Sequence, residues 1–501
     1  MLTLASLLQR AETHFGDRTA IINTGATWRG HVKKARQIAK TFNMKPGMRF
    51  AIIAPNCVSQ AELLHAGYLS GAVPVPVNWR LSPPEVLVIL ENSSPDLIFL
   101  GSSFSQLLST PILSPHLKNA VVVEEEGISG GVGSDPELDD TYAVSSDDTA
   151  LLLYTGGTSG APKGVPLTHG NIIASAFQIA PILEFSETTR YLHLAPSFHA
   201  ADLLATAVTM LGGSHAFLDK FDQHSFVEYA RNYAITATML APAVVRELVN
   251  TDDVELPDLK MLIYGSSPMD AALIRETCKL FPAAGIRQGY GLTETSPLIS
   301  ILGASEHRAI AAGEEVELTF SAGRPLPGVD LRVTNTAGQA CSFDVVGEIE
   351  VRGPNVFHGY FQKPTETKEA FNDGWFRTGD IGRINKQGYL FLMDRAKDMI
   401  ITGGENVYSI QVEDVLLAHS DVVEAAVIGL PHPKWGEEVT AVLVTRNEGL
   451  TTEIVREHCR AELAGYKIPR RVIFVDRLPR SALGKVLKHE LRASQESNNG
   501  R

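Results

Sequence analysis

The stretch Tyr154–Gly164, which reads YTGGTSGAPKG, determines how the rest of the chain is interpreted. It follows an apolar run, Ala150–Leu153, that indicates a buried strand. Glycines let backbone N–H groups approach an anion closely, and successive N–H groups in such a loop form an anion-binding concavity. The stretch also holds three hydroxyl donors and one mobile positive charge, on Thr155, Thr158, Ser159 and Lys163. It is therefore equipped to hold a polyphosphate.

A Gly/Ser-rich surface hairpin is the plain alternative, and the glycines alone do not separate the two interpretations. The lysine and the hydroxyls favour phosphate. The stretch is not a Walker loop, because that pattern places Ser or Thr after the lysine and then a helix, whereas Gly164 follows Lys163 here. Pro166 opposes an immediate helix. We therefore expect the loop to join two strands and the next helix to begin near Thr168 or Asn171.

The composition is that of a globular protein with several subdomains. The chain has 501 residues, too many for one ordinary core, with 44% hydrophobic and 20% charged residues. Its net charge of −13 gives no basic footprint for nucleic acid. An acidic protein that handles nucleotides must concentrate positive charge locally, through single lysines, arginines and a metal ion.

Cysteine usage and hydropathy suggest a cytoplasmic protein. The four cysteines are far apart and show neither metal-ligand spacing nor a disulfide framework; they are Cys57, Cys278, Cys341 and Cys459. The N-terminus has apolar residues at helical spacing but lacks the basic start and apolar core of a signal peptide. No apolar run is long enough to span a bilayer.

Hydrophobic patterning divides the chain into three regions. Residues 1–148 and 150–320 alternate helical and strand patterns, which indicates parallel α/β layers. Short strands with glycine turns then predict a small antiparallel β subdomain at about 321–394. A smaller α+β pattern runs from 398 to 501. The acidic, Gly- and Ser-rich segment 124–148 reads as a connection.

Four further clusters of functional side chains follow the phosphate loop. They are Tyr290–Thr295, Trp375–Asp380, Asp394–Asp398 with Gly403–Asn406 close behind, and Pro479–Lys485. In this order they resemble the motifs of acyl-activating, adenylate-forming enzymes. That superfamily includes acyl-CoA synthetases, the adenylation domains of non-ribosomal peptide synthetases and firefly luciferase. The similarity runs from the N-terminal helix to Lys485.

The resemblance implies a fold and a reaction. The fold is α/β: an N-terminal domain of α/β-layered sheets with the β subdomain (1–394), a hinge (395–397) and a small mobile α+β C-terminal domain (398–501). ATP and a carboxylic acid give an acyl-adenylate and pyrophosphate, and a thiol then displaces AMP. Lys397 is the implied hinge residue.

The resemblance also implies a nucleotide site. The loop residues Thr155, Gly156, Gly157, Thr158, Ser159, Gly160 and Lys163 would hold the β- and γ-phosphates. Tyr290 and Gly291 would border adenine, with Gly265, Ser266, Ser267 and Pro268 on its other side. Thr293 would donate to the α-phosphate and Glu294 would ligate Mg²⁺, which prefers oxygen donors.

Three residues from the second half of the chain complete that implied site. Asp380 would accept from the ribose hydroxyls, and Arg395 would assist there. Lys485 would bridge the attacking carboxylate and the α-phosphate. Taken singly, these residues have plainer interpretations as a turn-capping acid, a surface ion pair and an exposed lysine.

The segment Pro196–His199 matches the family segment that lines the acyl pocket. Amino-acid-activating relatives usually carry aspartate where His199 stands, which argues against an α-amino acid substrate. His199 is then either a gate between the ATP and acyl sites or a satisfied core histidine. Small residues are further wall candidates and suit a fatty tail or an aryl ring: Ala200, Ala201, Gly289, Gly291, Ser296 and Pro297. Asp202 and His193 are close in sequence and able to form a polar network.

The C-terminal region favours CoA as the acceptor. Gly403 and Gly404 resemble the turn that borders the pantetheine tunnel of CoA ligases, and Pro433–Glu437 and Ala464–Pro469 resemble the same branch. We therefore expect an ATP- and Mg²⁺-dependent acid–CoA ligase. A ligase that loads a carrier protein and a catalytically silent scaffold are the alternatives, and a homodimer is left open.

Overall fold

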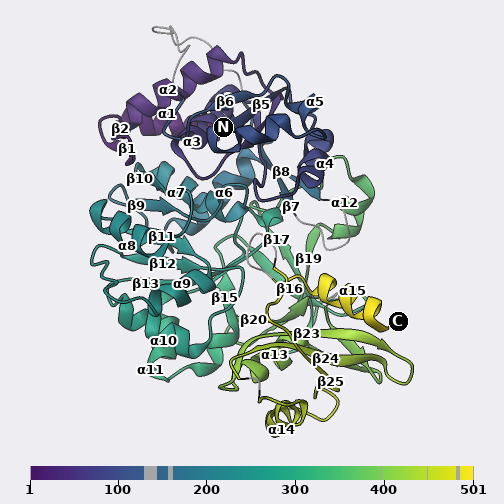
Figure 1. Cartoon of the computed structure of the whole chain (residues 1–501). Helices are drawn as coiled ribbons and strands as arrows, with labels where there is room; N and C mark the ends of the chain where they lie inside the picture. The colour runs from purple at the N-terminus through teal and green to yellow at the C-terminus, as the bar shows by residue number, and fades with distance from the viewer. Residues whose placement is uncertain are drawn as a thin grey trace. The chain divides into compact units, whose positions relative to one another are not determined.

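The computed structural model describes residues 2–128, 144–155, 162–395, 398–447, 449–480 and 486–499 (Figure 1). The chain forms two compact units. The first unit comprises Met1–Leu331 and Val351–Phe376, and the second comprises Arg332–Glu350 and Arg377–Arg501. Within the described ranges, no helix combines the length and the apolar character needed to cross a membrane.

The N-terminal helix forms as its hydrophobic spacing predicts. Helix α1 (Leu4–Phe15) starts at Thr3, whose Oγ1 accepts a 3.2 Å hydrogen bond from the Ser6 amide. Leu4, Leu7 and Leu8 are buried on one face of the helix. The helices α2 (Trp28–Thr41) and α3 (Val58–Ser70) pack against it.

A four-stranded sheet follows, with the strand order β4-β3-β5-β6. Its strands are β3 (Arg49–Ile53), β4 (Val73–Pro76), β5 (Leu97–Gly101) and β6 (Val121–Val123). All three pairings are parallel, as the alternating patterns predict. The connecting segments include α4 (Pro83–Ser93), η1 (Ser102–Ser109) and α5 (Ser114–Leu117).

The phosphate-loop stretch joins two strands, as predicted. Strand β7 (Thr149–Thr155) pairs antiparallel with β8 (Lys163–Thr168). Helix α6 (His169–Ile179) begins directly afterwards. The side chain of Thr168 caps it by accepting a 3.1 Å bond from the Asn171 amide. The predicted helix start is therefore confirmed.

A long sheet in the first unit has the strand order β15-β14-β13-β12-β11-β9-β10-β1-β2. Its strands are β1 (Thr19–Ile21), β2 (Ala26–Thr27), β9 (Arg190–His193), β10 (Ser214–Phe217), β11 (Ala237–Leu240), β12 (Met261–Tyr264), β13 (Gly285–Tyr290), β14 (Ser300–Leu302) and β15 (Ser321–Pro325). The run from β10 to β13 is parallel throughout. The carboxyl ends of these strands therefore share one edge, where open α/β sheets bind ligands.

Helices and short turns connect those strands. They are η2 (Ala200–Leu204), α7 (Ala205–Leu211), α8 (Gln223–Asn232), α9 (Pro242–Val249), α10 (Ala271–Leu280), η3 (Thr293–Thr295), α11 (Ala304–Ala312) and η4 (Val316–Phe320). Helices α8, α10 and α11 lie alongside the strands β11 to β13 (Figure 1). Later in the first unit come α12 (Pro364–Ala370) and β18 (Phe371–Asn372).

The second unit contains a small antiparallel β region and an α+β region. The strands β16 (Asp330–Thr334), β17 (Gly347–Arg352), β19 (Trp375–Ile384) and β20 (Leu390–Arg395) are neighbours in this order. A second sheet has the order β22-β21-β24-β23, with β25 beside β24. Its elements are β21 (Ile400–Thr402), β22 (Glu405–Val407), α13 (Ser409–Leu417), β23 (Val422–His432), β24 (Gly436–Thr445), α14 (Thr452–Glu462), β25 (Arg471–Phe474) and α15 (Lys488–Asn499).

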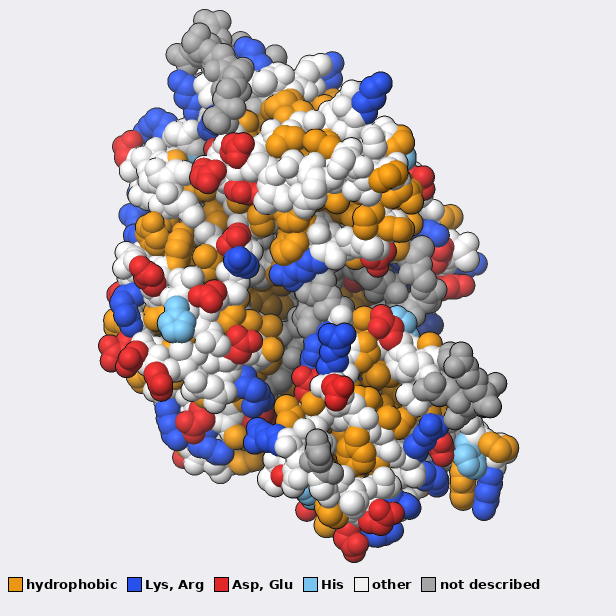
Figure 2. Space-filling view, in the orientation of Figure 1, with side chains coloured by type: hydrophobic (Ala, Val, Ile, Leu, Met, Phe, Trp, Pro, Cys, Tyr) orange, Lys and Arg blue, Asp and Glu red, His pale blue; other side chains and the backbone are white. Residues whose placement is uncertain are grey.

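The predicted β region is divided between the two units: its residues 332–350 and 377–394 share one compact unit with the C-terminal region, and its residues 321–331 and 351–376 belong to the first unit. A functional domain boundary at 395–397 stays a prediction, and residues 396 and 397 lie outside the described ranges. On the face shown in Figure 2, acidic and basic side chains are interspersed over both units. That face does not gather positive charge into one continuous patch.

Candidate active site

The loop end of the β7–β8 hairpin carries two of the predicted phosphate ligands. Thr155 and Lys163 are cross-strand partners, and Thr155 Oγ1 lies 3.5 Å from the Lys163 carbonyl oxygen. The five loop positions predicted between them, Gly156, Gly157, Thr158, Ser159 and Gly160, lie outside the described residues. The hairpin therefore presents a hydroxyl and an ammonium on either side of that loop.

Tyr360 connects the lysine to the predicted magnesium ligand. The Lys163 ammonium lies 4.9 Å from the centre of the Tyr360 ring, at the distance of a cation–π contact. The Tyr360 hydroxyl donates a 3.0 Å hydrogen bond to Glu294 Oε1. Burial, and then the Glu294 carboxylate, raise the pKa of Tyr360, so its hydroxyl keeps its proton and remains a donor.

Glu294 meets the chemical requirement for a magnesium ligand. It is 7% exposed, and its backbone carbonyl accepts a 2.8 Å bond from the Phe357 amide, which fixes the turn η3. Its carboxylate supplies the hard oxygen donor that Mg²⁺ prefers. Thr293 is the preceding residue and is partly exposed. The two predicted residues therefore start one short turn, with the carboxylate held in place.

The predicted adenine-binding residues follow two adjacent strands of the parallel sheet. Strands β12 and β13 pair with Tyr264 opposite Gln288. The segment Gly265–Pro268 follows β12, and Tyr290 ends β13 and is 9% exposed. Both segments thus begin at the carboxyl edge of the sheet, where nucleotides bind in α/β folds. Their role in binding adenine stays a prediction.

The predicted acyl-pocket residues come from two segments of the first unit. Gly291 approaches Pro297 closely, because a Cβ atom on Gly291 would lie 2.0 Å from the Pro297 carbonyl oxygen. Ser296 is fully buried next to them. His199 precedes η2, which contains Ala200 and Ala201, and its ring lies 4.6 Å from that of Phe198. Gly289 lies on β13.

In the second unit, Asp380 and Arg395 form a cross-strand ion pair. They are register partners on β19 and β20, with Arg395 Nε 2.7 Å from Asp380 Oδ1. The Asp380 amide donates a 3.1 Å bond to Thr378 Oγ1. Asp380 is 5% exposed, whereas the Arg395 side chain is 40% exposed. The guanidinium therefore orients a nearly buried carboxylate, which can accept from hydroxyl groups.

The glycine turn predicted for CoA is a tight hairpin turn between β21 and β22. Gly403 and Gly404 have φ of +61° and +85°, the left-handed region that glycine occupies without strain. The Gly403 amide donates a 2.8 Å bond to the Trp435 carbonyl oxygen. The Trp435 ring centre lies 4.4 Å from the Arg470 guanidinium and 4.7 Å from the Lys434 ammonium. An aromatic face and two cations thus border the turn.

Lys485 and Lys397, the predicted catalytic lysine and hinge residue, lie outside the described residues. The sequence analysis did not assign roles to Tyr360, Trp435 or Arg470. Trp435 lies inside a quoted motif next to Lys434, so an aromatic residue beside a cation was available there as a signal. Nothing in the local spacing around Tyr360 points to Glu294.

Comparison with known proteins identifies the family. The AMP-binding enzyme family profile matches residues 8–361, and the AMP-binding enzyme C-terminal domain profile matches residues 411–485. The chain is 34% identical to a 2-succinylbenzoate–CoA ligase of Bacillus velezensis over 493 residues, covering 97% of this chain and 96% of the relative. It is 31% identical to a long-chain-fatty-acid–CoA ligase of Mycobacterium tuberculosis over 496 residues, with coverage of 97% and 96%.

A solved structure shows the same fold. The o-succinylbenzoate coenzyme A synthetase of Bacillus subtilis, in complex with ATP and magnesium ion, matches with a TM-score of 0.85 and 30% identity. The match covers 97% of this chain and 98% of that chain. The chain therefore belongs to the AMP-binding enzyme family. Within it, the chain is an adenylate-forming enzyme of the acyl-CoA synthetase branch, which confirms the predicted class and α/β fold.

Proposed function

We propose that this protein is an ATP-dependent acid–CoA ligase acting on a fatty or aryl monocarboxylate. It forms an acyl-adenylate with release of pyrophosphate and then transfers the acyl group to CoA with release of AMP. The observation that carries this proposal is the Lys163–Tyr360–Glu294 arrangement beside the phosphate hairpin. Relatives named as CoA ligases support CoA over a carrier protein as the acceptor.

The first half-reaction brings together two negative groups, a carboxylate and the α-phosphate of ATP. Lys163 and Thr155 bind the terminal phosphates, and Glu294 holds the magnesium ion. When bound, Mg²⁺ neutralises phosphate charge and polarises the phosphoryl group. Thr293 and Lys485 donate to the oxygens where charge develops, which lowers the barrier most when the donors are already in position.

Three sets of residues bind the nucleoside half of ATP in this proposal. Tyr290 stacks on adenine, and Gly265–Pro268 borders its other face. Asp380 accepts hydrogen bonds from the ribose hydroxyls. The 2.7 Å ion pair with Arg395 holds that carboxylate in one orientation. Arg395 thus acts by positioning Asp380.

The second half-reaction requires a different surface. Lys485 serves adenylation and then leaves, so that Gly403, Gly404 and the CoA thiol can approach. Such a swing concentrates the dihedral change in one or two linker residues. We assign that hinge to Lys397. Trp435, Arg470 and Lys434 supply an apolar face and two positive charges for a molecule that carries both pantetheine and phosphates.

The acyl group occupies the region between Gly291 and the segment His199–Ala201. Its walls are small, and His199 occupies the position where amino-acid-activating relatives carry aspartate. The substrate is therefore an acid without an α-amine. A cytoplasmic location follows from the sequence expectations, and a homodimer is compatible with the proposed function.

A screen of carboxylic acids with ATP, Mg²⁺ and CoA tests this function. Acid-dependent pyrophosphate release measures the first half-reaction, and thioester formation measures the second. We expect fatty or aryl acids to exceed α-amino acids in both. If thioester formed only on a phosphopantetheinylated carrier protein, the carrier protein and not CoA would be the acceptor. Pyrophosphate release that does not depend on an acid would exclude the ligase function.

A further inference from the structure

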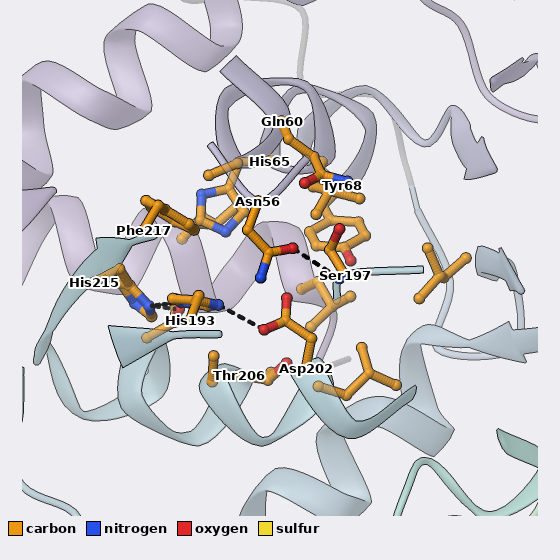
Figure 3. A pocket seen from close by; sticks show the side chains of 18 of the residues that line it. Asn56, Gln60, His65, Tyr68, His193, Ser197, Asp202, Thr206, His215 and Phe217 are labelled. Carbon is orange, nitrogen blue, oxygen red and sulfur yellow. Dashed lines mark hydrogen bonds and ion pairs between the residues drawn. The ribbon is translucent and has the colours of Figure 1, made fainter. Parts of the chain in front are cut away.

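A cavity of about 70 Å³ lies inside the first unit, between the N-terminal helices and strands β9 and β10 (Figure 3). A cavity needs about 10–15 Å³ of space open to the centre of a water molecule to hold one water molecule. The cavity therefore has room for several water molecules or for one end of a small organic molecule. Its lining includes none of the described residues assigned above to ATP.

The lining has an apolar part and a polar part. Apolar side chains come from α1, β1, α3 and β10: Leu4, Leu7, Leu8, Ile21, Leu64 and Phe217. Polar side chains also line the cavity, among them Asn56, Gln60, His65, Tyr68, Ser197 and Asp202 (Figure 3). An apolar wall with a few converging polar groups is the usual composition of a small-molecule site.

Asp202 is the one carboxylate in the described lining, which contains no glutamate, lysine or arginine. Hydrogen bonding to its neighbours fixes its position. Its Oδ1 lies 2.6 Å from His193 Nδ1. The other nitrogen of His193 lies 3.0 Å from His215 Nδ1, and His215 Nε2 lies 3.0 Å from Thr209 Oγ1. The Asp202 side chain is 13% exposed. A chain of side chains thus holds one carboxylate at the cavity surface.

Ser197 offers a second hydrogen-bonding group. Its amide donates a 3.0 Å bond to Asn56 Oδ1, which fixes the backbone. The residue is 8% exposed, and its hydroxyl is buried without a hydrogen-bond partner among the described residues. A buried hydroxyl left without a partner loses free energy relative to one that is bonded. A group inside the cavity would supply that missing partner.

The charges around the cavity select the chemistry of that group. Burial lowers the pKa of His65 and of His215 well below the ordinary value, so both imidazoles are neutral near pH 7. The described lining contains no lysine or arginine. A carboxylate entering the cavity would face the Asp202 carboxylate with no lysine or arginine of the described lining beside it, whereas a hydroxyl or an ammonium group could donate to Asp202.

Two residues of the cavity lining stand next to the proposed acyl-pocket segment in the sequence. Ser197 and Asp202 flank the segment His199–Ala201, which the proposed function places in the acyl-pocket wall. We propose that the cavity receives the far end of the acid substrate, and that Asp202 accepts a hydrogen bond from a hydroxyl or ammonium group there. This inference rests on the proposed function. It narrows the substrate to monocarboxylic acids with a distal hydrogen-bond donor.

Matched acids and two variants test the inference. The acids are phenyl acids with and without a para-hydroxyl group, and straight-chain acids ending in methyl, hydroxyl, ammonium or carboxylate. We expect wild type to favour the best hydroxyl or ammonium acid over its unsubstituted partner by about 10- to 100-fold in kcat/KM for thioester formation. The Asp202→Asn and Ser197→Ala variants should each reduce that ratio, mainly through KM.

Glu228→Gln is the matched control, because Glu228 lies exposed on α8 and outside the cavity lining. It should leave the ratio unchanged. Ser197→Ala removes a hydroxyl that has no hydrogen-bond partner among the described residues, so we expect its melting temperature to match wild type. This variant keeps the test valid if Asp202→Asn unfolds. This inference alone would be overturned if wild type formed thioesters with no preference for donor-bearing acids. It would also be overturned if the variants lost kcat/KM equally on the donor-bearing acid and on its unsubstituted partner. No thioester with any acid would overturn the proposed function and this inference with it.

Discussion

The phenolic hydroxyl of Tyr360 donates a 3.0 Å hydrogen bond to the carboxylate of Glu294, across 66 positions of sequence. The ring of the same tyrosine lies 4.9 Å from the Lys163 ammonium. One aromatic side chain therefore contacts both the proposed magnesium ligand and the proposed phosphate lysine. Its two contacts use different parts of the residue, so substitutions can separate them.

Tyr360→Phe should weaken the use of magnesium. The substitution keeps the ring beside Lys163 and removes the donor to Glu294. A hydrogen bond to a charged group contributes about 1.5–3 kcal/mol, so we expect a loss of at least about tenfold in acid-dependent pyrophosphate release. The Mg²⁺ concentration for half-maximal rate should rise, which a magnesium titration measures. Tyr360→Leu, which also removes the ring, should additionally raise KM for ATP. An unchanged magnesium titration in Tyr360→Phe would contradict the assigned role.

Arg395→Gln should raise KM for ATP by about tenfold with a smaller change in kcat, because Asp380 would lose the ion pair that orients it. Initial-rate measurements at varied ATP concentration give both constants. Arg377→Gln is the control. Arg377 lies on the same strand as Asp380, forms an ion pair with Glu348 and has no proposed ligand contact. Equal effects of the two variants would mean that the Arg395 ion pair only stabilises the fold.

Trp435→Ala should affect only the second half-reaction. Removing the indole leaves the cations of Arg470 and Lys434 without their aromatic contact and opens space beside Gly403. We expect KM for CoA to rise about tenfold or more, while acid-dependent pyrophosphate exchange stays at the wild-type rate. A parallel fall in the exchange rate would show that Trp435 supports folding or adenylation instead.

Lys485→Ala should separate the half-reactions in the opposite direction. Adenylation should fall by about 100- to 1,000-fold, as expected when one donor to the developing charge is removed. Thioester formation from supplied acyl-adenylate and CoA should continue. Loss of both activities to the same extent would reject the proposal that Lys485 serves adenylation only.

The stability of the second unit should depend on pH through Asp394. Burial raises the pKa of this carboxyl from 3.8 to about 6, although Lys488 and Ser409 oppose the change. The folded state then holds this proton more tightly than the unfolded chain does. Its contribution to the free energy of unfolding is full below about pH 4 and is lost as the pH rises to about 6.

Asp394→Asn removes that titration. At about 1.4 kcal/mol per pKa unit, the difference between the pKa of 3.8 and that of about 6 corresponds to about 3 kcal/mol of the free energy of unfolding. Denaturant unfolding of wild type and variant across this pH range should show the difference between them changing in favour of the variant as the pH rises. Asp476→Asn, at an exposed position, should show no such change. If the free energies of unfolding of wild type and Asp394→Asn changed in parallel with pH, the prediction would be refuted.

Local patterns predicted the elements of the fold well. The run Ala150–Leu153, the glycine loop and Pro166 together predicted a strand, a connection and a second strand, and β7 and β8 confirm this reading. Hydrophobic periodicity works there because it follows directly from one buried face. The resemblance to a family added the roles of Asp380 and Arg395, and the strand register brings these two residues together.

Long-range contacts could not be predicted in the same way. His193 and His215 lie on different strands, and their bond depends on the parallel register of β9 and β10. Tyr360 meets Glu294 only because Phe357 and Phe361 anchor its segment to the turn η3 and to β8. Such pairings are set by tertiary packing, so single-sequence periodicity carries no signal for them.

The position of Trp435 also gives the protein a built-in optical signal. It is one of four tryptophans, and its indole is partly exposed and contacts two cations next to Gly403, whereas Trp28 is fully buried. Indole fluorescence changes with local polarity and with nearby charge. A molecule that arrives beside this turn and displaces water or a cation will therefore change the emission. Stopped-flow fluorescence on the unlabelled enzyme could time the arrival of the acceptor. The Trp435→Phe variant, which keeps the other three tryptophans, gives the background signal.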